Sequence, residues 1–332
     1  MDWANNCQQA AVGWEVRLSQ SVAILENAGC CGVQAASELA RRVAQTTVIR
    51  SDEPLDKHTT LRVGGPADIY VEPASEQDLA AVLACCHGHG WQIFVVGRGS
   101  NLLVKDRGFR GVVISLAQAQ FRRIEVTGER LSCGAGAKLK MIAAETKRNS
   151  LAGLEFLEGI PGSLGGALRM NAGAMGCALF DVVESVRFMS LDGIAHERPV
   201  QDMMVAYRSC PTLKDHVATS AILRGKPGSR EEIEQRINEF NRKRWQSQPT
   251  APSAGCMFKN PGTIPAGKLI DEMGLKGTRV GGAMVSTEHG NFIVNDGKAT
   301  AQHVLELVEL IRQRVRAERG IELETEVEII GE

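Results

Sequence analysis

The chain has few aromatic residues: they make up 5% of its 332 residues and include only two tyrosines. Proteins that bind single-stranded nucleic acid use aromatic side chains as stacking platforms, and proteins that bind duplexes use a basic surface. The 38 basic and 39 acidic residues give a formal charge of −1, so there is no general basic surface. We therefore expect no nucleic-acid partner, and any anionic ligand must be held by donors placed at one site.

Long hydrophobic runs and a secretory signal pattern are also missing. No segment approaches the roughly 20 apolar residues that span a bilayer, and residues 1–16 lack a basic start followed by an apolar stretch. The nine cysteines never show Cys-x-x-Cys spacing, which disfavours zinc ribbons and secreted disulfide frameworks. We expect a cytoplasmic protein without membrane insertion. A polar helix end before Gly90 explains the near pair His87 and His89, so we predict no metal site.

Alternating strand and helix patterns cover most of the chain. A strand over 67–73, a helix over 75–90 with Ser75 as N-cap, and short strands over 93–97 and 111–115 predict a βαβ unit. Further patterns follow in this order: a strand–turn–strand over 123–136, an amphipathic helix over 138–149, a hairpin over 182–200 turning at Asp192-Gly193, a helix before Gly274, a turn at 295–297, a helix over 300–320 and an alternating strand over 322–331.

Composition divides the chain into four parts. Residues 1–50 form an N-terminal extension of unknown role with a helix near 34–45, and the compact fold is expected to begin near Leu55. Two α/β subdomains follow, over 51–118 and 119–226. A polar stretch ends the second, and a helix that starts at Ser229 with a capping box to Glu232 opens the last part, 227–332.

Two glycine clusters indicate close contact between backbone and ligand. Gly97 and Gly99 follow an apolar strand directly and precede Ser100 and Asn101, a pattern that can aim backbone N–H groups at an anion. Neither a complete dinucleotide fingerprint nor a P-loop is present. The second cluster lies within residues 159–176 and mixes glycines with apolar side chains, which suggests a wall against a flat, partly apolar ligand. Together the clusters favour a pyrophosphate-containing cofactor with a planar ring.

Six co-linear blocks resemble the UDP-N-acetylenolpyruvoylglucosamine reductase family. The blocks are HTTLRVGGPAD (58–68), VVGRGSNLLV (95–104), the segment from Gly153 to Gly176, AYRS (206–209), PSAGCMFKNP (252–261) and ELETEV (322–327). The resemblance covers about residues 50–332. The short stretch between Arg208 and Ser229 is typical of the abbreviated-loop, type II-like subtype.

The resemblance implies a fold, a reaction and its cofactors. The expected fold is α+β, with two FAD-binding α/β subdomains of the vanillyl-alcohol-oxidase or PCMH-like type and a C-terminal α/β substrate-binding domain. The expected reaction reduces UDP-N-acetylglucosamine enolpyruvate to UDP-N-acetylmuramate in peptidoglycan precursor synthesis. NADPH would reduce non-covalently bound FAD, whose N5 passes hydride to the substrate. We expect the protein to act as a monomer.

The family's functional residues carry over by position. The resemblance implies that Arg208, Glu326 and Cys256 are catalytic. It also assigns the substrate contacts to Tyr207, Lys259 and Asn260. The cofactor contacts that it implies are Gly64, Gly65, Gly97, Arg98, Gly99, Ser100, Asn101, Ile160, Pro161, Gly162, Gly165, Gly166, Asn171 and Gly173.

Cys256 departs from the family pattern, in which a serine usually donates the proton. A thiol with an ordinary pKa of about 8.5 is mostly protonated at neutral pH and is a better acid than a serine hydroxyl. Arg208 would pair with the substrate carboxylate, and Glu326 would help stabilise the enolic intermediate. Two alternatives stay open at this point: a flavin oxidase acting on another substrate, and a flavin- or nucleotide-binding protein without catalytic activity.

Overall fold

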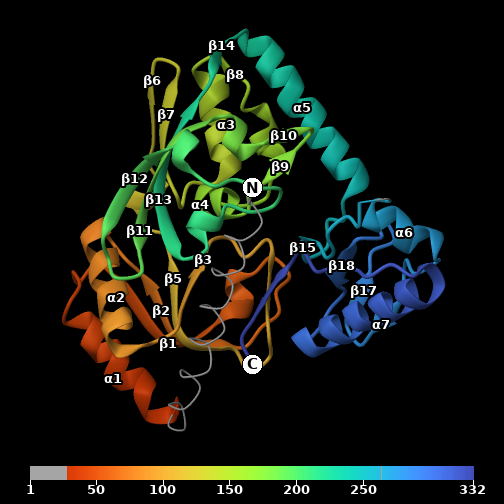
Figure 1. The fold of residues 1–332 in the computed structure, drawn as a ribbon, viewed down its shortest axis with the longest axis horizontal. Coiled ribbons are helices and arrows are strands. Elements are labelled where there is room, and N and C mark those ends of the chain that lie inside the picture. The colour runs from red at the N-terminus through yellow and green to blue at the C-terminus, as the bar shows by residue number, and fades with distance from the viewer. Residues whose placement is uncertain (1–27, 263) are drawn as a thin grey trace, which may run out of the picture.

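The computed structural model describes residues 28–262 and 264–332 (Figure 1). Most of the proposed N-terminal extension, residues 1–27, lies outside the described residues. Three successive units follow one another along the chain, each with its own main sheet. Helices and sheets alternate in all three, so the expected α+β class is confirmed.

The first unit is built on a four-stranded sheet in the order β1-β2-β5-β3. Its elements are α1 (Ala28–Ala40), β1 (Val48–Pro54), β2 (Pro66–Glu72), α2 (Glu76–His89), β3 (Ile93–Val96), β4 (Leu102–Val104) and β5 (Phe109–Ser115). Strands β2 and β3 both run parallel to β5, and β1 is an antiparallel edge strand. Ser75 caps α2 as predicted, because its Oγ accepts the Asp78 N–H at 3.1 Å.

The compact fold begins earlier than Leu55, and that expectation is wrong. Strand β1 pairs with β2 from Val48 onward, and Leu39 of α1 is fully buried in the core. The first helix also ends at Ala40 rather than near residue 45. The reason lies in Asp78, whose carboxylate accepts the Ala44 N–H at 2.9 Å and the Thr47 hydroxyl at 3.0 Å. These hydrogen bonds compete with helix continuation and turn the chain towards β1.

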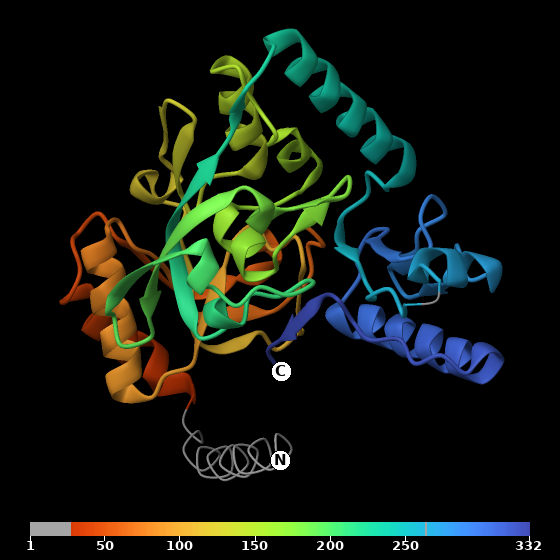
Figure 2. The same ribbon diagram turned by 45° about the horizontal axis from the view of Figure 1, so that its top comes forward.

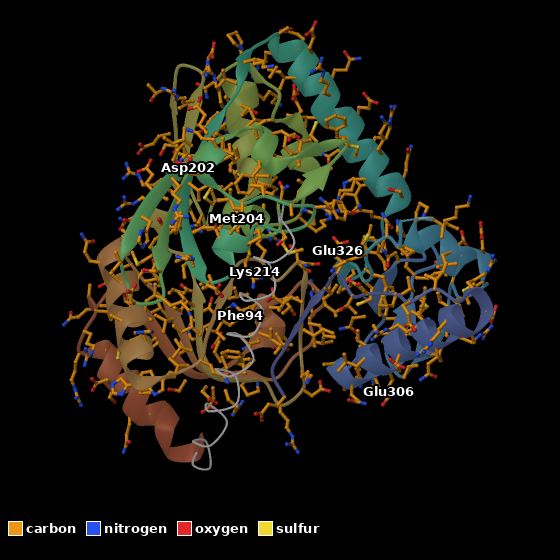
Figure 3. All side chains as sticks on the ribbon, in the orientation of Figure 1. Phe94, Asp202, Met204, Lys214, Glu306 and Glu326 are labelled. Atoms are coloured by element: carbon orange, nitrogen blue, oxygen red, sulfur yellow. The ribbon has the colours of Figure 1, made fainter. Side chains whose placement is uncertain are left out.

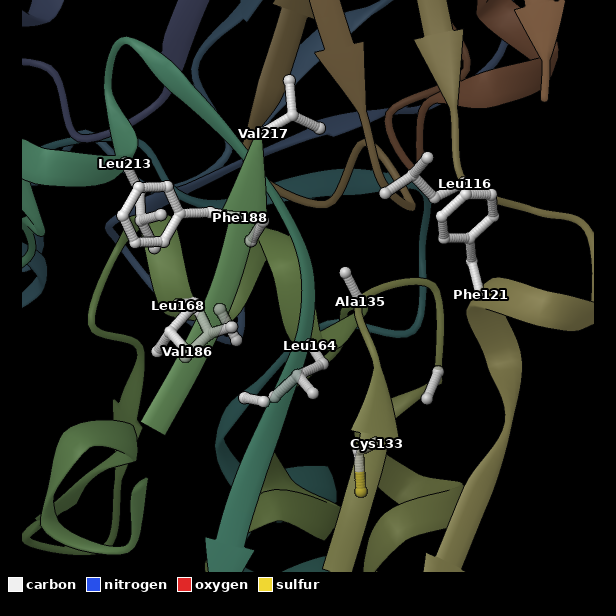
Figure 4. Packing of buried hydrophobic residues seen from close by; sticks show 14 of the residues in the cluster. Leu116, Phe121, Cys133, Ala135, Leu164, Leu168, Val186, Phe188, Leu213 and Val217 are labelled. Atoms are coloured by element: carbon white, nitrogen blue, oxygen red, sulfur yellow. The ribbon is translucent and has the colours of Figure 1, made fainter. Parts of the chain in front are cut away.

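The second unit has a five-stranded antiparallel sheet in the order β12-β11-β13-β7-β6. Its elements are β6 (Ile124–Thr127), β7 (Arg130–Gly134), α3 (Leu139–Arg148), β8 (Leu151–Ala152), α4 (Leu164–Arg169), β9 (Gly173–Ala174), β10 (Cys177–Ala178), β11 (Val183–Ser190), β12 (Ala195–Pro199), β13 (His216–Arg224) and β14 (Lys226–Pro227). Figure 4 shows Leu164 and Leu168 of α4 beside Val186 and Phe188 of β11. The same core continues into the first unit, so these two units pack as one body.

Helix α5 (Arg230–Ser247) packs on the second unit, along which Figure 2 shows it running before the chain enters the third. Ile233 is buried, and Asn241 donates to Glu158 at 3.2 Å. Ser229 accepts the Glu232 N–H at 3.4 Å, while its hydroxyl donates to Glu231. A domain boundary at residue 227 would separate α5 from the surface that it covers.

The third unit contains a four-stranded sheet in the order β15-β18-β17-β16, drawn in blue in Figure 1. Its elements are β15 (Ser253–Cys256), α6 (Ala266–Glu272), β16 (Arg279–Val280), β17 (Ala283–Val285), β18 (Phe292–Asn295), α7 (Ala301–Arg319) and β19 (Glu328–Ile330). The helix expected over 300–320 is present as α7, and the apolar side chains along one of its faces are buried: Val304, Leu307, Val308, Ile311 and Val315. Burial of such side chains contributes about 1.5–3 kcal/mol each, which fixes α7 on the sheet.

The C-terminal segment returns from the third unit to the first. The strand expected over 322–331 is shorter than predicted: β19 pairs in parallel with β4 through Glu328 and its two successors. Upstream of it, Thr325 forms an isolated antiparallel bridge with Phe258. The segment therefore joins the first and third units. Among the described residues, no helix combines the length and the hydrophobicity needed to cross a bilayer.

Candidate active site

A cleft of about 260 Å³ lies between the first and second units. Backbone from β3 and the start of α4 forms two of its walls, and side chains of Phe94 and Lys214 approach from opposite units (Figure 3). Four residues of the predicted cofactor set line it: Gly97, Arg98, Gly165 and Gly166. The cations that line it are Arg98, Arg122, Lys138, Arg169 and Lys214. A cleft with glycine walls and several cations suits a flat group attached to an anionic tail.

Glycine is required at the cleft because the walls approach each other closely. A Cβ on Gly97 would collide with the Ser163 hydroxyl, and one on Gly165 would lie 3.1 Å from the Ala135 Cβ. Gly99 has a φ of +58°, and a Cβ there would collide with the His58 carbonyl oxygen. Ser100 closes the loop by donating to the Pro161 carbonyl oxygen. The two predicted glycine clusters therefore meet in space.

Several residues of the predicted cofactor set lie elsewhere. A Cβ on Gly64 would lie 2.6 Å from the Val104 Cβ, and one on Gly65 would lie 2.5 Å from the Gly108 nitrogen. These two glycines allow the chain to pack against the end of β4. Gly173 occupies the short hairpin of β9 and β10. The remaining members, Ile160, Pro161 and Gly162, lie in the segment that precedes α4.

Arg208 projects from a tight turn held by the end of α4. Ala206 and Ser209 exchange two backbone hydrogen bonds, at 2.8 and 3.2 Å. Arg208 has a φ of +55°, a left-handed conformation that costs a non-glycine residue of order 1–3 kcal/mol and often marks a functional site. Asn171 fixes the turn because its amide donates to the Ala206 carbonyl oxygen at 3.2 Å.

Cys256 lies at the end of β15, opposite Phe292 of β18. A bulge precedes it, with Gly255 at a φ of +79°. The buried Asn291 holds Phe258, two residues after Cys256: its side-chain Oδ1 accepts the Phe258 N–H at 2.9 Å, and its side-chain amide donates to the Phe258 carbonyl oxygen at 2.8 Å. This turn is therefore fixed by side-chain as well as backbone hydrogen bonds.

Glu326 lies beside both the thiol turn and the cofactor loop. Its N–H donates to the Met257 carbonyl oxygen at 2.8 Å, and its carbonyl oxygen accepts the Asn101 amide at 3.1 Å. Thr60 ties the same region together, since its hydroxyl donates to the Ser253 carbonyl oxygen at 2.6 Å and its N–H donates to that of Gly99. Asn101 thus connects the glycine loop to the backbone of the residue that carries the predicted catalytic carboxylate.

The three predicted catalytic side chains converge. Arg208 Nε lies 3.1 Å from Glu326 Oε1, and both side chains are largely buried. The Nε–H has no hydrogen-bond partner with good geometry, so the pair is an ionic contact. The Nε–H group can therefore donate a hydrogen bond to a further acceptor. Burial, together with the Glu326 charge, raises the pKa of the Cys256 thiol to about 11, against a smaller opposing effect of Arg208. The charges of Arg208 and Glu326 therefore both act on the Cys256 thiol.

Glu326 has a pKa above its ordinary value. Burial is the main cause, and the nearby cations Arg208 and Lys259 oppose it. A carboxyl group with a raised pKa can share or hold a proton near neutrality. The site thus combines a protonated thiol, a carboxyl group with raised proton affinity and one permanent cation.

The predicted substrate residues lie around this centre. Tyr207 is 70% exposed, and the Arg208 guanidinium lies 5.5 Å from its ring centroid. Lys259 pairs with Glu324 at 2.9 Å at the exposed rim. Asn260 accepts the Ala266 N–H at 3.0 Å and so begins α6. All three residues are exposed, so a ligand can reach them.

Sequence reasoning missed several polar residues of the site. Arg169 and Lys138 line the cleft, Asn291 holds the thiol turn, and Arg244 at the end of α5 is a largely buried cation whose pKa is lowered by burial. None lies in a motif with a distinctive spacing. Only the apolar surroundings of Asn291, in GNFIV (290–294), could have marked it as a buried polar residue.

One cluster of potential metal donors lies in the first unit. The donor atoms of Glu38, Cys85 and His89 lie within 4.8 Å of one another. Arg42 already donates two hydrogen bonds to Glu38, at 3.1 and 2.6 Å. The cluster belongs to α1 and α2, and none of its residues contacts the cleft lining.

Two family models match the chain. Residues 248–330 match the C-terminal domain of UDP-N-acetylenolpyruvoylglucosamine reductase, and residues 67–197 match an FAD binding domain. The first match starts after α5 and includes Cys256 and Glu326. The second includes the glycine loop, α4 and the first strands of the second unit.

Curated relatives and a solved structure agree with these matches. The UDP-N-acetylenolpyruvoylglucosamine reductase of Clostridioides difficile is 42% identical over 86% of this chain and 94% of its own. That of Heliobacterium modesticaldum is 44% identical over 84% and 90%. The crystal structure of the Thermus caldophilus enzyme superposes with a TM-score of 0.75 at 39% identity, covering 86% of this chain and 99% of that one.

Proposed function

This chain belongs to the UDP-N-acetylenolpyruvoylglucosamine reductase family, and from that premise we propose how its own residues perform the reaction. The protein is a flavin-dependent oxidoreductase of peptidoglycan synthesis that reduces UDP-N-acetylglucosamine enolpyruvate with NADPH. The observation that carries the proposed mechanism is the convergence of Cys256, Arg208 and Glu326 beside the glycine loop.

The cleft fits FAD. Gly97, Gly165 and Gly166 present no side chains to the cleft that they line, so a flat ring can lie against their backbone. The lining cations and the glycine-loop backbone suit a pyrophosphate. Bound FAD supplies the hydride that it has received from NADPH. We assign the ring to the walls formed by Gly97, Gly165 and Gly166.

Arg208 binds the carboxylate of the enolpyruvyl group. Its guanidinium is permanently charged and its Nε–H has no well-directed partner. When hydride reaches the terminal carbon of the enol ether, negative charge develops on the adjacent carbon and its carboxylate. A charge-assisted hydrogen bond from Arg208 stabilises that charge.

Cys256 donates the proton to the adjacent carbon. A pKa of about 11 keeps the thiol protonated across the neutral range, so the acid is present in every molecule. The developing carbanion is far more basic than a thiolate, and the S–H proton therefore moves to carbon as that charge grows. Glu326 is ionised beside Arg208 in the free enzyme, and its raised pKa lets it share a proton with the enolic form of the substrate.

Two further guanidinium groups, those of Arg98 and Arg244, suit the diphosphate of the nucleotide. Arg98 of the glycine loop acts electrostatically on Arg244 of α5, with Glu158 as the acidic neighbour. Two cations close enough to repel each other are stabilised when an anion binds beside them. The exposed Tyr207 and Lys259 add polar groups near Arg208 and Glu326. We propose that the substrate's diphosphate binds there and its enolpyruvyl end reaches Arg208.

The flavin reaction can be measured as two separate half-reactions, and the two measurements together test the proposed function. Under anaerobic conditions, NADPH should bleach the bound flavin, and the enolpyruvyl nucleotide should restore its colour. Rapid reoxidation by oxygen alone would instead favour a flavin oxidase, and protein without a flavin spectrum would favour a non-catalytic binding protein. We also propose that the enzyme acts as a cytoplasmic monomer, which light scattering of the purified protein checks for the oligomeric state.

A further inference from the structure

Arg169 links the two elements that carry the proposed catalytic ion pair. It is the last residue of α4 and lines the cleft. Its carbonyl oxygen accepts the Cys210 N–H at 2.9 Å, directly after the turn that carries Arg208. Asn171, two residues on, holds the other end of that turn through the Ala206 carbonyl oxygen. The backbone around Arg169 thus positions Arg208.

The Arg169 side chain holds the other element. Its Nη1 donates to Glu328 Oε2 at 2.6 Å and its Nη2 donates to Glu328 Oε1 at 3.0 Å. Both side chains are about one-third exposed, at 36% and 34%, so the pair is partly screened. A two-point contact of this kind fixes orientation as well as distance. Glu328 lies two residues after Glu326 and starts the strand that pairs with β4.

Each of the two arginines beside the proposed catalytic centre pairs with a different glutamate. Two cations and two carboxylates lie on adjacent elements, and the structure pairs Arg169 with Glu328 and Arg208 with Glu326. Glu328 accepts two hydrogen bonds from Arg169, whereas Glu326 has a single-point contact with Arg208. Lys259 and Cys256 are the other titratable groups that act on this centre. Loss of Glu328 would leave Arg169 free to compete for Glu326.

We propose that the Arg169–Glu328 pair positions Glu326 against Arg208 and keeps the Arg169 charge away from the Glu326 carboxyl group. Arg169 is thus a positioning residue for protonation of the substrate, acting through Glu328 and the Arg208 turn. The inference rests on the roles proposed above for Glu326 and Arg208.

Glu328→Gln in the FAD-loaded enzyme tests this, because it keeps the shape and removes the charge. Flavin reduction by NADPH should stay within about 2-fold of wild type. Reoxidation by the enolpyruvyl nucleotide should slow by about 10- to 100-fold, the range that misplacement by up to 1 Å produces. The acidic limb of its pH profile should also move to lower pH, since a free Arg169 lowers the pKa of Glu326. Arg169→Lys, which keeps the charge but loses the two-point geometry, should show a smaller loss in the same half-reaction.

Arg187 and Glu76 provide a matched control. They form a similar two-point ion pair, with Nε at 3.1 Å and Nη2 at 2.9 Å from one carboxylate oxygen, and they also join the second unit to the first. Glu76→Gln should change the melting temperature about as much as Glu328→Gln does, but neither half-reaction. The comparison thus separates positioning from general stability.

Each other outcome has a definite meaning. Wild-type reoxidation by Glu328→Gln and Arg169→Lys alike would overturn the inference. So would an equal loss of both half-reactions or of FAD affinity measured by fluorescence, because the pair would then serve the cofactor cleft. Failure of wild-type protein to be reoxidised by the nucleotide would instead contradict the proposed function, and wild-type behaviour of Glu326→Gln would contradict the role assigned to Glu326.

Discussion

The cofactor cleft and the proton-transfer centre lie side by side but are built differently. The cleft has walls of backbone, and glycines such as Gly97 and Gly165 let those walls approach each other. The centre consists of side chains from three distant segments, Arg208, Cys256 and Glu326. The cleft depends on positions without side chains, and the centre depends on the chemistry of three side chains. Substitutions in the cleft should therefore change FAD binding, and substitutions in the centre should change reoxidation by the substrate.

The supports of the two sites also differ. Gly99 and Ser100 rest on the backbone of residues 58–59 and 161, within a core that the first two units share. The thiol turn belongs to the third unit and is held by Asn291. Asn101 and the C-terminal segment are the contacts that join them. Protonation therefore depends on how the third unit docks, whereas flavin binding depends on the first two.

Cys256→Ala should produce the largest effect. The substitution removes the proposed acid, so reoxidation of reduced flavin by the enolpyruvyl nucleotide should fall by about 10²- to 10⁴-fold, the usual contribution of general acid catalysis. Flavin reduction by NADPH should stay near wild type, because no proton from Cys256 is needed there. Anaerobic stopped-flow absorbance measures the two steps separately.

Cys256→Ser is the control for this prediction. The hydroxyl keeps a transferable proton at the same position, so substantial reoxidation should remain. Equal rates in the alanine variant and wild type would remove Cys256 from the mechanism.

Gly99→Ala should weaken FAD binding, by a smaller factor than the loss of reoxidation expected for Cys256→Ala. A Cβ there collides with the His58 carbonyl and lies 2.7 Å from the Thr59 Cα, so the loop must shift. Overpacking of this kind costs about 1–3 kcal/mol, which corresponds to about a 5- to 150-fold loss of FAD affinity. Fluorescence titration of the apoprotein with FAD measures it.

Gly128→Ala is the matched control for the strain that a left-handed backbone conformation imposes on alanine. Gly128 has a φ of +60°, close to that of Gly99, yet nothing lies within 4 Å of its Cβ position. This variant should lose about 1–2 kcal/mol of stability from the left-handed conformation alone and bind FAD normally. Similar FAD affinities in the two alanine variants would show that the Gly99 contact is unimportant.

Glu326→Gln should make Cys256 more reactive. Burial, followed by the Glu326 charge, raises the thiol pKa to about 11, so thiolate is scarce and alkylation by iodoacetamide should be slow at neutral pH. Removal of the charge should speed alkylation at pH 8 by about 3- to 10-fold, since thiolate rises tenfold per unit of pKa. Mass spectrometry of the peptide that contains Cys256 measures the rate without interference from Cys210.

The sign of the pH dependence follows from the same group. Reoxidation needs the protonated thiol, so it should persist through pH 9 and fall as the pH rises through about 11. In Glu326→Gln that fall should begin at lower pH. An unchanged alkylation rate and pH profile in this variant would show that Glu326 does not act on the thiol.

Local patterns predicted the elements well, and the site only in part. The Ser75 cap, the Asp192-Gly193 hairpin and the helix expected over 300–320 follow from short-range rules and are confirmed. The predicted end of α1 was wrong because Asp78, far along the chain, accepts a hydrogen bond from the backbone that follows the helix. The glycine clusters indicated a cofactor from the residues alone. Arg208 and Glu326 came only from family resemblance, because either would otherwise be taken for a surface charge.

Tyr207 should show the smallest effect, at the rim where the two regions meet. It is 70% exposed, and its ring lies 5.5 Å from the Arg208 guanidinium. An exposed contact of this kind contributes about 0.5–1 kcal/mol, so Tyr207→Leu should raise the KM for the enolpyruvyl nucleotide about 2- to 5-fold. Tyr207→Phe keeps the ring and should match wild type, while flavin reduction by NADPH should be unchanged in both. If the phenylalanine variant lost as much as the leucine variant, the hydroxyl would be the important group, and Tyr207 would bind the nucleotide directly rather than orient Arg208.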